Sequence, residues 1–516
     1  MKKNRIFFVV AALAILAIAI LSRFIFLSSR PVHHDEGMLA YFAWKLAQEK
    51  DYIYTPQIHA PILFYVQAII FKLFKAGDYT LRVAPAIFGI ILIFIPIFFS
   101  RQIGKNKALF LALAFLISPF FLYYSRFLVH SSMVVVFWLA FIFTLRSFFI
   151  KPDPVNFYLC FVYLAGAFGT SETTYIFLAS VVGFIVPALI FMRPETLKIL
   201  RRTILFIREN PVDIIVGPLL FITLWVLIYS VGFTNYKSLL ISLPNPFNEN
   251  SGLGFWLAQH PKRLGSQPWY YYLNLAFIYE PLVLAGSVAG IISLFKKRTP
   301  FFLFLGWLVA TTLVGFSIAG EKFPWLFLCP LMPLTVFSIW YLAGVWQKMN
   351  IALKIIVVIL ALFTAFGAVR LNYFLAADTN ELAVYVQTPL SFRKIKSEIT
   401  QNCILSKSNE CVLIDQQITW PLSWDFRDFS SLYISDSLQV KEKTKYILSA
   451  SENAQMLKLP SKWEGQKISL RDWWVPEKCS LIKEPSVCAK NYLRYFFFRR
   501  TWSDKGGYDI YVYRLN

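Results

Sequence analysis

The chain has 516 residues, of which 57% are hydrophobic, 18% aromatic and only 16% charged. This balance excludes an ordinary soluble domain and is typical of a polytopic membrane protein. A net charge of +22 would suggest a nucleic-acid partner in a soluble chain. Here the basic residues cluster in short loops between apolar runs, where the positive-inside rule accounts for many of them. We therefore expect membrane lipids as neighbours and no nucleic-acid partner.

The first apolar run covers residues 6–27, about the roughly 20 residues that cross a bilayer. Because Lys2, Lys3 and Arg5 precede it, we expect the N-terminus in the cytoplasm. No small-residue cleavage site follows the run, so we interpret it as a retained span and not as a removed signal peptide. Residues 28–80 then form a first loop on the outer face, in which the short apolar run 62–74 predicts an interfacial or re-entrant helix.

Ten further apolar runs follow, which brings the expected number of transmembrane helices to about eleven. They cover residues 81–100, 107–123, 127–150, 156–169, 173–192, 212–232, 270–294, 300–319, 323–345 and 351–374. The basic loops between them fall on the side assigned to the cytoplasm. An odd number of spans leads the C-terminal part to the outside, so we expect a multi-pass protein of the plasma membrane with an extracytoplasmic C-terminal domain.

Two domains are expected, a transmembrane domain over residues 1–374 and a soluble α/β domain over residues 375–516. The transmembrane domain includes outer loops over residues 28–80 and 233–269. In the C-terminal domain, the alternating runs 411–414 and 508–513 predict strands, and residues 382–385 and 392–399 predict helices. Two roles are open for this domain. It either shields the outer end of the transmembrane domain or recognises the molecule on which that domain acts.

The six cysteines divide by environment. Cys160 and Cys329 lie in apolar runs, which predicts buried thiols. Two pairs in the C-terminal domain are close in sequence, Cys403 with Cys411 and Cys479 with Cys488. Their spacing favours two local disulfides in an oxidising compartment over free thiols, and it does not resemble a zinc pattern.

Polar side chains gather at four places on the predicted outer side. The groups are His33, His34, Asp35 and Glu36; His59 with Arg82; Arg126 and His130 with Glu172; and Glu321 with Lys322. Each has a structural interpretation, because Asp35 and Glu172 suit helix starts, the two arginines can extend to the lipid interface, and Glu321 can pair with Lys322. Acids and guanidinium groups beside a bilayer also suit a base and the cations that hold a lipid-linked phosphate.

Common catalytic motifs are missing from the sequence. No P-loop, G-x-G-x-x-G, H-E-x-x-H or G-x-S-x-G element occurs, which argues against nucleotide-driven pumps and the usual hydrolases. The sequence identifies no cofactor. Neighbouring residues of a helix do not converge on one point, so no single segment forms a metal site. If a divalent metal takes part, the candidate ligands are Asp35, Glu36, His59 and His130.

The arrangement of these features resembles the GT-C glycosyltransferases, in their protein-mannosyltransferase and aminoarabinose-transferase (PMT/ArnT-like) branch. Within that branch, the narrower resemblance is to prokaryotic Agl-type proteins described as flippase-associated. The motifs that carry it are His34-Asp35-Glu36, His59-Ala60-Pro61, Tyr124-Ser125-Arg126-Phe127, Glu172-Thr173, Gly320-Glu321-Lys322-Phe323-Pro324-Trp325, Trp420-Pro421-Leu422-Ser423-Trp424 and Arg427-Asp428. Two positions depart from relatives: His130-Ser131-Ser132 follows the third motif where some carry an acid, and Ser171 stands where others carry Lys.

The resemblance implies an inverting glycosyltransferase that moves a sugar from a polyprenyl-phosphate-linked donor to an acceptor hydroxyl on the outer face. Asp35 would be the base, and Glu36 would orient it or share its role. Cations for the donor phosphate would be Arg82, Arg126 and Lys322, and further pocket candidates are His34, His59, Glu172 and Glu321. The acceptor, whether protein, lipid or glycan, and the sugar remain open.

Two other function classes compete with this one. The flippase-associated relatives keep open a non-enzymatic protein for lipid-linked glycan translocation, or a scaffold. An ion-coupled transporter agrees less well, because such proteins tend to bury ionisable groups near the middle of the membrane, whereas these gather at one edge.

Overall fold

The computed structural model describes residues 2–49, 52–263, 267–296, 298–434, 438–477 and 484–515. The chain divides into two compact units. The first, which we call the helical unit, comprises Met1–Ile25, Lys50–Val66 and Val83–Asn372. The second, the α/β unit, comprises Phe26–Glu49, Gln67–Arg82 and Tyr373–Asn516. The α/β unit thus combines the C-terminal part with two segments of the first predicted outer loop.

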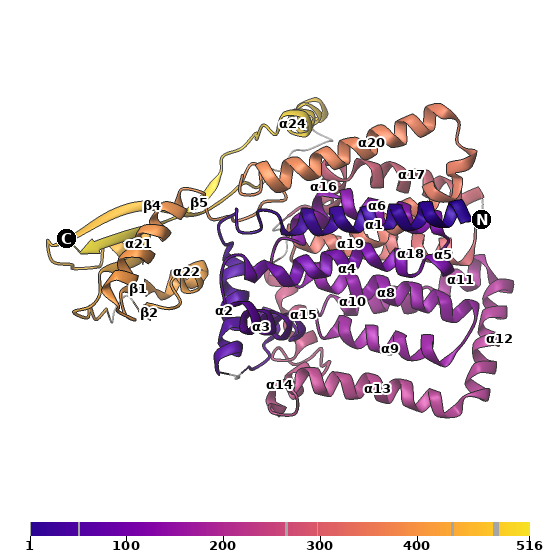
Figure 1. Cartoon of the computed structure of the whole chain (residues 1–516), viewed down its shortest axis with the longest axis horizontal. Helices are drawn as coiled ribbons and strands as arrows, with labels where there is room; N and C mark the ends of the chain where they lie inside the picture. The colour runs from indigo at the N-terminus through magenta and orange to yellow at the C-terminus, as the bar shows by residue number, and fades with distance from the viewer. Residues whose placement is uncertain are drawn as a thin grey trace. The chain divides into compact units, whose positions relative to one another are not determined.

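Long apolar helices make up the helical unit, and Figure 1 shows α1, α4, α8, α9 and α13 running along a common direction. Its helices are α1 (Lys2–Phe24), α4 (Val83–Phe98), α5 (Ser100–Ile103), α6 (Lys105–Ile117), α7 (Pro119–Tyr124), α8 (Ser131–Ile150), α9 (Pro154–Phe168), α10 (Thr174–Gly183), α11 (Ile185–Phe191), α12 (Arg193–Glu209), α13 (Pro211–Tyr229), α14 (Tyr236–Ser242), α15 (Gly252–Lys262), α16 (Tyr271–Tyr279), α17 (Pro281–Lys296), α18 (Pro300–Ile318), α19 (Leu328–Val345) and α20 (Ile351–Val369). The helix α3 (Ile62–Phe74) begins in this unit, over the residues expected to form an interfacial helix.

Among the described residues, eight helical segments are long and apolar enough to cross a membrane, and a ninth results if the bent pair α16 and α17 counts as one span. Several of them expose apolar side chains, since only 6% of the α1 window and 11% of the α13 and α20 windows is buried within the protein. Lipid is the environment that suits such surfaces. The chain is a multi-pass membrane protein.

The sequence expectation of about eleven spans differs from this number at three runs, all of which are helical. Residues 107–123 break at Ser118 into α6 and α7, because Pro119 has no N–H to continue the first helix and Ser118 caps the second. Residues 156–169 lie in the 15-residue helix α9, which is short for a span. Residues 270–294 bend by 113° between α16 and α17.

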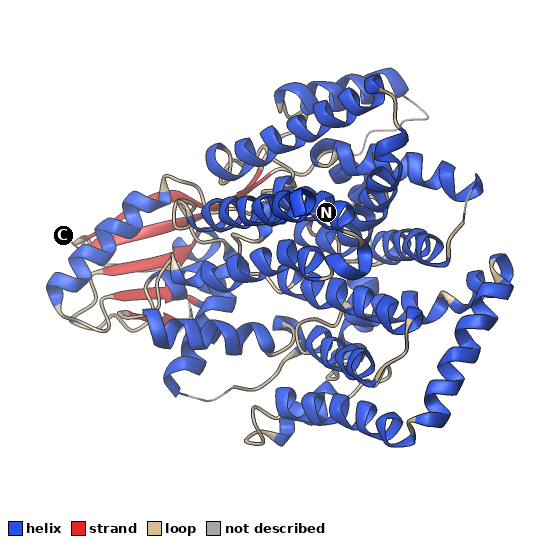
Figure 2. Ribbon diagram, turned by 45° about the vertical axis from the view of Figure 1, so that its right-hand side comes forward, coloured by secondary structure: helices blue, strands red, loops and turns tan. Residues whose placement is uncertain are grey.

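The α/β unit contains a five-stranded mixed sheet, drawn in red in Figure 2. Its strands are β1 (Val412–Asp415), β2 (Ser430–Tyr433), β3 (Tyr446–Ala450), β4 (Trp463–Trp473) and β5 (Gly506–Leu515). Its helices are α2 (His34–Glu49), α21 (Phe392–Ser406), α22 (Thr419–Asp425), α23 (Ser451–Ala454) and α24 (Pro485–Phe498). The strand order is β2-β1-β3-β5-β4, with β1 parallel to β2 and β3, and β5 antiparallel to β3 and β4.

Both faces of the central strands are covered. Ile414, Leu448 and Val512 lie in register across β1, β3 and β5 and belong to the larger core cluster. Leu413 and Ile447, on the opposite face, belong to a second cluster. Burial on both faces explains why β1 and β3 read as continuous apolar runs and not as an alternating pattern.

The predictions for this unit were mostly confirmed. Strands occur where runs 411–414 and 508–513 predict them, and α21 begins at Phe392. The helix expected over residues 382–385 was wrong, because these residues form turns. The N–H of Leu382 donates to the Tyr495 hydroxyl at 2.8 Å, and that hydroxyl donates to the Asn380 carbonyl at 2.7 Å. A side chain from α24 thus provides the bonds that a helix would have made.

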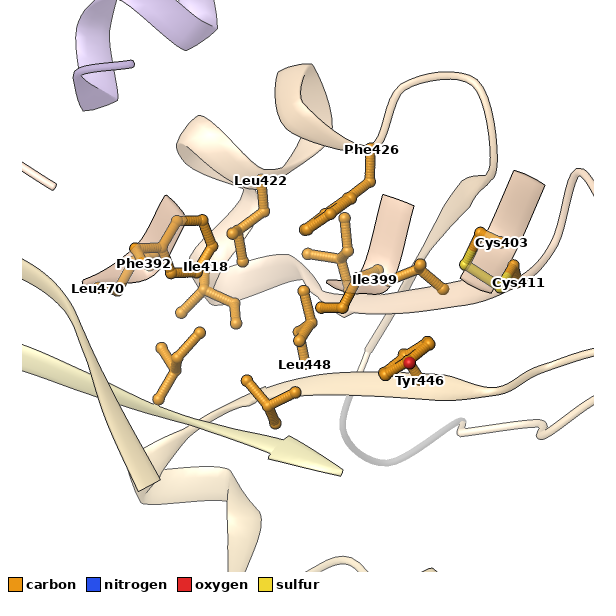
Figure 3. Packing of buried hydrophobic residues seen from close by; sticks show 14 of the residues in the cluster. Phe392, Ile399, Cys403, Cys411, Ile418, Leu422, Phe426, Tyr446, Leu448 and Leu470 are labelled. Atoms are coloured by element: carbon orange, nitrogen blue, oxygen red, sulfur yellow. A yellow bond between two sulfur atoms is a disulfide. The ribbon is translucent and has the colours of Figure 1, made fainter. Parts of the chain in front are cut away.

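A disulfide joins Cys403 and Cys411 at the edge of the larger core cluster, beside Ile399 and Tyr446 (Figure 3). This confirms the first predicted pair. For the second, Cys479 lies outside the described residues. Cys329 is a buried free thiol and Cys160 a half-buried one.

Replacement of Cys403 and Cys411 together by serine should destabilise the α/β unit by about 2–3 kcal/mol, because the short closed loop regains conformational freedom in the unfolded state. The measurement is the thermal unfolding of the purified protein by tryptophan fluorescence. Cys329→Ser is the control, because it removes a thiol that forms no bridge. An unfolding temperature unchanged by the double substitution would contradict this prediction.

Candidate active site

Two clusters of polar side chains contain most of the candidate residues. The acidic loop, residues 30–36 together with Arg82, lies in the α/β unit. The His59 pocket, built around His59 and Glu172, lies in the helical unit. Each is described in its own unit.

The helix α2 begins with a reciprocal cap formed by His33 and Glu36. The N–H of Asp35 donates to His33 Nδ1 at 3.0 Å, and the N–H of His33 donates to Glu36 Oε2 at 3.1 Å. These bonds satisfy N–H groups that have no partner within the helix. The capping role that the sequence suggested for Asp35 is therefore taken by its neighbours.

The carboxylate of Glu36 is fully buried between two arginines. Arg82 donates from Nε to Oε1 at 2.9 Å and from Nη2 to Oε2 at 2.8 Å, and Arg30 donates from Nη2 to Oε1 at 2.9 Å. Burial opposes the charged form of Glu36, but the Arg30 and Arg82 guanidiniums outweigh it and lower the carboxyl's pKa to about 2. Glu36 is thus ionised at neutral pH, a poor base, and shielded from any substrate hydroxyl.

Arg82 is as buried as Glu36, with a side chain only 1% exposed. Its Nη1 donates to the carbonyls of Leu27 and Arg30 at 2.9 and 3.0 Å, and its Nη2 also donates to that of Pro31 at 3.2 Å. A phosphate would have to displace one of these partners. The predicted phosphate contact of Arg82 stays a prediction, and the geometry favours a role in holding the loop.

His33 is neutral in this setting. Burial lowers the pKa of its imidazole to about 4, although the charges of Asp35 and Glu36 act in the opposite sense. Its Nε2 lies 2.5 Å from the carbonyl oxygen of Tyr385, so the ring proton belongs on Nε2. This tautomer leaves Nδ1 as the acceptor that the helix cap requires.

Asp35 differs from Glu36 in exposure. Its side chain is 27% exposed, and the nearest ionisable nitrogens, His33 Nδ1 and His34 Nε2, both lie 3.9 Å from its oxygens. Within the described part of the chain, its carboxylate accepts no hydrogen bond. Arg471 of β4 interacts electrostatically with Asp35. The His33–Glu36 cap fixes the backbone that carries this carboxylate, while the carboxylate itself is partly open to solvent and can be reached from outside.

The His59 pocket is a cavity of about 320 Å³. Glu172 accepts from the Tyr54 hydroxyl at 2.7 Å and lies 2.8 Å from His59 Nδ1. The His59 ring stacks on Trp256, with centroids 4.8 Å apart, and contacts the His130 ring at 3.6 Å. Two predicted pocket residues, His59 and Glu172, therefore form one hydrogen-bonded pair on the cavity wall.

Glu321 lines the same cavity. It pairs with Arg263 at 2.6 Å, and not with its neighbour Lys322 as the structural interpretation suggested. Lys322 Nζ donates to the Ala319 carbonyl at 2.8 Å, and this is the one bond of its ammonium among the described residues. The ammonium thus retains hydrogens for a further acceptor.

The remaining predicted cation, Arg126, binds the end of α1. Its Nη1 donates to the carbonyls of Ser22 and Ile25, both at 2.8 Å, and to that of Arg23 at 3.2 Å. These carbonyls belong to the helix end that lacks partners within the helix. Arg126 is 7% exposed, and this arrangement favours a structural role.

The candidate metal ligands do not assemble into a site. Among the described residues, no group of three or more His, Cys, Asp or Glu side chains is placed to hold a metal ion. Nδ1 of His59 is engaged by Glu172, and Glu36 by two arginines. Both ring nitrogens of His130 are buried without a hydrogen-bond partner in the described structure.

The sequence analysis missed several partners of these residues. Arg30 lies three residues before His33, so nearness to the acidic motif could have identified it. Tyr54, Arg263, Gln387 and Arg471 are far in sequence from the groups that they bind, and only the folded chain brings them there.

Comparison with known proteins finds one family model and several similar folds. Residues 58–207 match the family model described as dolichyl-phosphate-mannose-protein mannosyltransferase. The crystal structure of ArnT from Cupriavidus metallidurans bound to undecaprenyl phosphate is similar with a TM-score of 0.61 and 16% identity, over 86% of this chain and 94% of that one. The crystal structure of the same protein in the apo state is similar with a TM-score of 0.51 and 15% identity, over 81% of this chain and 85% of that one. A search of curated protein sequences found no match.

The archaeal oligosaccharyltransferase AglB from Archaeoglobus fulgidus, in complex with an inhibitory peptide and a dolichol-phosphate, matches with a TM-score of 0.48 and 13% identity, over 87% of this chain and 70% of that one. The likeness to ArnT confirms the expected GT-C fold with its C-terminal α/β sheet. The family match covers residues 58–207, and the likeness to ArnT extends the shared fold over most of the chain. Over residues 58–207, the pattern is that of the protein mannosyltransferases.

Glu36→Gln should destabilise the α/β unit by about 3 kcal/mol or more, because it leaves two buried guanidiniums without their counter-charge. Thermal unfolding followed by tryptophan fluorescence measures the change. Glu410→Gln is the matched control, since Glu410 forms an exposed ion pair with Lys441 whose loss should cost less than about 1 kcal/mol. If the two substitutions lowered the free energy of unfolding equally, the buried ion pair would not contribute more than the exposed one, and the prediction would be wrong.

Acidification should weaken the α/β unit through His33. Because its pKa falls to about 4 in the folded state from 6.5, the unfolded chain binds more protons between these values, and stability decreases as pH falls from about 6.5 to about 4. His33→Asn keeps a capping side chain but does not titrate, so unfolding temperatures measured from pH 7 to 4.5 should depend less on pH.

Other groups also titrate in this pH range. Burial raises the pKa of Asp425 to about 6, and this carboxyl changes stability in the opposite sense. Because both proteins contain these groups, the difference between their two pH series reports on His33. The same slope in both proteins would show that His33 does not titrate as described.

Proposed function

We propose that the chain transfers a sugar, with inversion, from a polyprenyl-phosphate-linked donor to an acceptor hydroxyl on the outer face of the membrane, with Asp35 as the base. The family description names a dolichyl-phosphate-mannose donor, and ArnT, which shares the fold, was solved with undecaprenyl phosphate. The observation that carries the proposal is the contrast between the partly exposed Asp35 and the buried Glu36.

In the proposed reaction, the Asp35 carboxylate takes the proton of the acceptor hydroxyl as the oxygen attacks the anomeric carbon. The new carbon–oxygen bond forms as the bond from that carbon to the phosphate oxygen breaks, and the electron pair leaves with the polyprenyl phosphate. Attack opposite the leaving group inverts the anomeric centre. Glu36 takes no proton, and its role with Arg30 and Arg82 is to fix the loop that presents Asp35.

A cation near the leaving phosphate would stabilise its developing charge. Of the three predicted cations, Lys322 agrees best with this role, because its ammonium keeps hydrogens for a phosphate oxygen while Arg82 and Arg126 are engaged by carbonyls. We assign Lys322 to the phosphate, and Arg82 and Arg126 to positioning.

The His59 pocket suits an amphiphilic donor. Ile176, Leu257, Phe316 and other apolar side chains line most of its wall. The His59 and Glu172 pair and Glu321 form its polar part. We assign the apolar wall to the prenyl chain and the polar part to the hydroxyls of the head group.

The orientation and the subfamily belong to the proposal as well. The basic loops support a cytoplasmic N-terminus and an extracytoplasmic C-terminal domain. The motifs quoted above support a place among the Agl-type proteins, with a protein, lipid or glycan acceptor. A translocation or scaffold protein of that group would not need Asp35 as a base, which gives the test.

Asp35→Asn should abolish transfer while carrier binding persists, because the amide keeps the shape of the side chain but cannot accept a proton. The measurement is glycan formation, by mass spectrometry, in cells that lack the native copy, alongside the affinity of the purified protein for undecaprenyl phosphate. Asp509→Asn, which alters a surface pair with Lys467, should leave both unchanged. Normal glycan formation with Asp35→Asn would favour the non-enzymatic role.

A further inference from the structure

We propose that the C-terminal part of the chain is a positioning element of the transfer site, in which Gln387 and the kink of α22 at Trp420 and Pro421, called the Trp420–Pro421 turn below, set the orientation of the loop that carries Asp35. The inference rests on the function proposed above and names the residues through which the C-terminal part acts on it. It differs from the two roles considered from sequence, a shield for the outer mouth and a site for acceptor recognition.

Gln387 connects the acidic loop to the sheet. Its side chain is completely buried. Its Oε1 accepts from Arg30 Nη1 at 3.0 Å, and its Nε2 donates to the Pro31 carbonyl at 3.1 Å. Its backbone exchanges two hydrogen bonds with Asp472 of β4, at 2.9 and 3.0 Å. Because Arg30 also binds Glu36, a displacement of Gln387 would pass through two buried bonds to the residue beside Asp35.

The Trp420–Pro421 turn packs directly on the first turns of α2. The Trp420 carbonyl lies 3.2 Å from His34 Nδ1 and accepts from Arg471. The Trp420 ring contacts the rings of Tyr41 and Phe42, with centroids 5.3 and 5.7 Å apart. These contacts bracket Asp35 on both sides along the helix.

Gly37 shows how close this packing is. A Cβ atom added at Gly37 would lie 2.7 Å from Cβ and 2.9 Å from Cα of Pro421. Carbon atoms do not approach so closely without displacement, and one of the two is backbone. A glycine two residues after Asp35 therefore lets the turn approach the helix, and any side chain there would separate them.

A second set of contacts holds the other loop segment, which ends at Arg82. Lys396 Nζ lies 2.7 Å from Asp78 Oδ2 and 2.6 Å from Asp425 Oδ1. Trp424 Nε1 donates to Asp78 Oδ1 at 3.2 Å, and Arg427 Nη2 donates to the Ala76 carbonyl at 2.8 Å. The C-terminal part thus binds both segments whose ends meet in the ion pair of Glu36 with Arg82.

The functional consequence follows from the demands of transfer. A base must lie within hydrogen-bond reach of the acceptor hydroxyl, and a misplacement of about 1 Å can lower the rate about 10²-fold. Neither Gln387 nor the turn needs to touch a substrate for this effect. They are positioning residues that act through the loop.

Gly37→Ala tests the turn without removing any polar group. Alanine favours a helix more than glycine does, so loss of helix stability cannot explain a defect. We expect glycan formation to fall by about 10²-fold, while the affinity for undecaprenyl phosphate and the amount of protein in the membrane stay as in the unsubstituted chain. Gly344→Ala is the matched control, because a Cβ at Gly344 of α19 meets nothing within 4 Å.

Gln387→Met tests the polar connection independently, since methionine has a similar length but donates and accepts no such bonds. As with Gly37→Ala, we expect a large loss of sugar transfer while the affinity for undecaprenyl phosphate is retained. Gln466→Met is its control, because Gln466 is an exposed residue of β4 that binds Arg514 at 2.9 Å.

The outcomes separate this inference from the proposed function. If both variants form glycan at the normal rate while Asp35→Asn is inactive, the positioning role is wrong and the function stands. If the variants lose carrier affinity along with transfer, the role is also wrong, because the defect is then general. If Asp35→Asn is itself active, the proposed function fails first.

Discussion

The buried ion pair of Glu36 with Arg30 and Arg82 is the constraint on which the rest of the site depends. Removal of three charged groups from water is costly, and only mutual contacts and further hydrogen bonds offset that cost. Both arginines therefore take part in additional bonds, Arg82 with three backbone carbonyls and Arg30 with Gln387. A loop held in this way cannot relax gradually, because each displacement would leave a buried charge without its partner.

This constraint explains how two adjacent acids acquire different properties. Asp35 and Glu36 are consecutive on one helix, so their side chains point in different directions. One direction leads to buried arginines and the other to partial solvent exposure. The environment and not the chemical type of the side chain thus separates a buried, ion-paired carboxylate from one that solvent can reach.

The sequence predicted the parts of the molecule that follow from local pattern. Every apolar run named from the sequence is helical, and the alternating run 508–513 identified β5, but apolar length gave no sign of the helices α12, α14 and α15. Breaks within the runs were missed, because Pro119 in one run and Glu280 with Pro281 in another interrupt a helix while the run as a whole stays apolar. Leu382 formed a turn for a related reason, since its partner Tyr495 is remote in sequence.

The candidate site was predictable only as a set of residues and not as a set of contacts. Chemistry at the start of α2 could be proposed from Asp35 and Glu36 alone. The partners could not be assigned, because backbone carbonyls bind much of Arg82 and Arg126, and a sequence gives no positions for carbonyl groups. Cationic residues in such a sequence therefore indicate where anions or carbonyls gather, but not which of the two they bind.

The division of the chain into a helical unit and an α/β unit explains why the acidic loop is held by residues remote in sequence. A loop between two membrane spans has few apolar contacts of its own, and the first turn of a helix is its least constrained part. If Asp35 acts as the proposed base, its loop needs support from elsewhere to keep the carboxylate in place. The α/β unit has a core of its own and a disulfide, so it offers a rigid surface against which the loop can be fixed. The C-terminal part thereby holds the start of α2 in a geometry that the loop residues alone would not maintain.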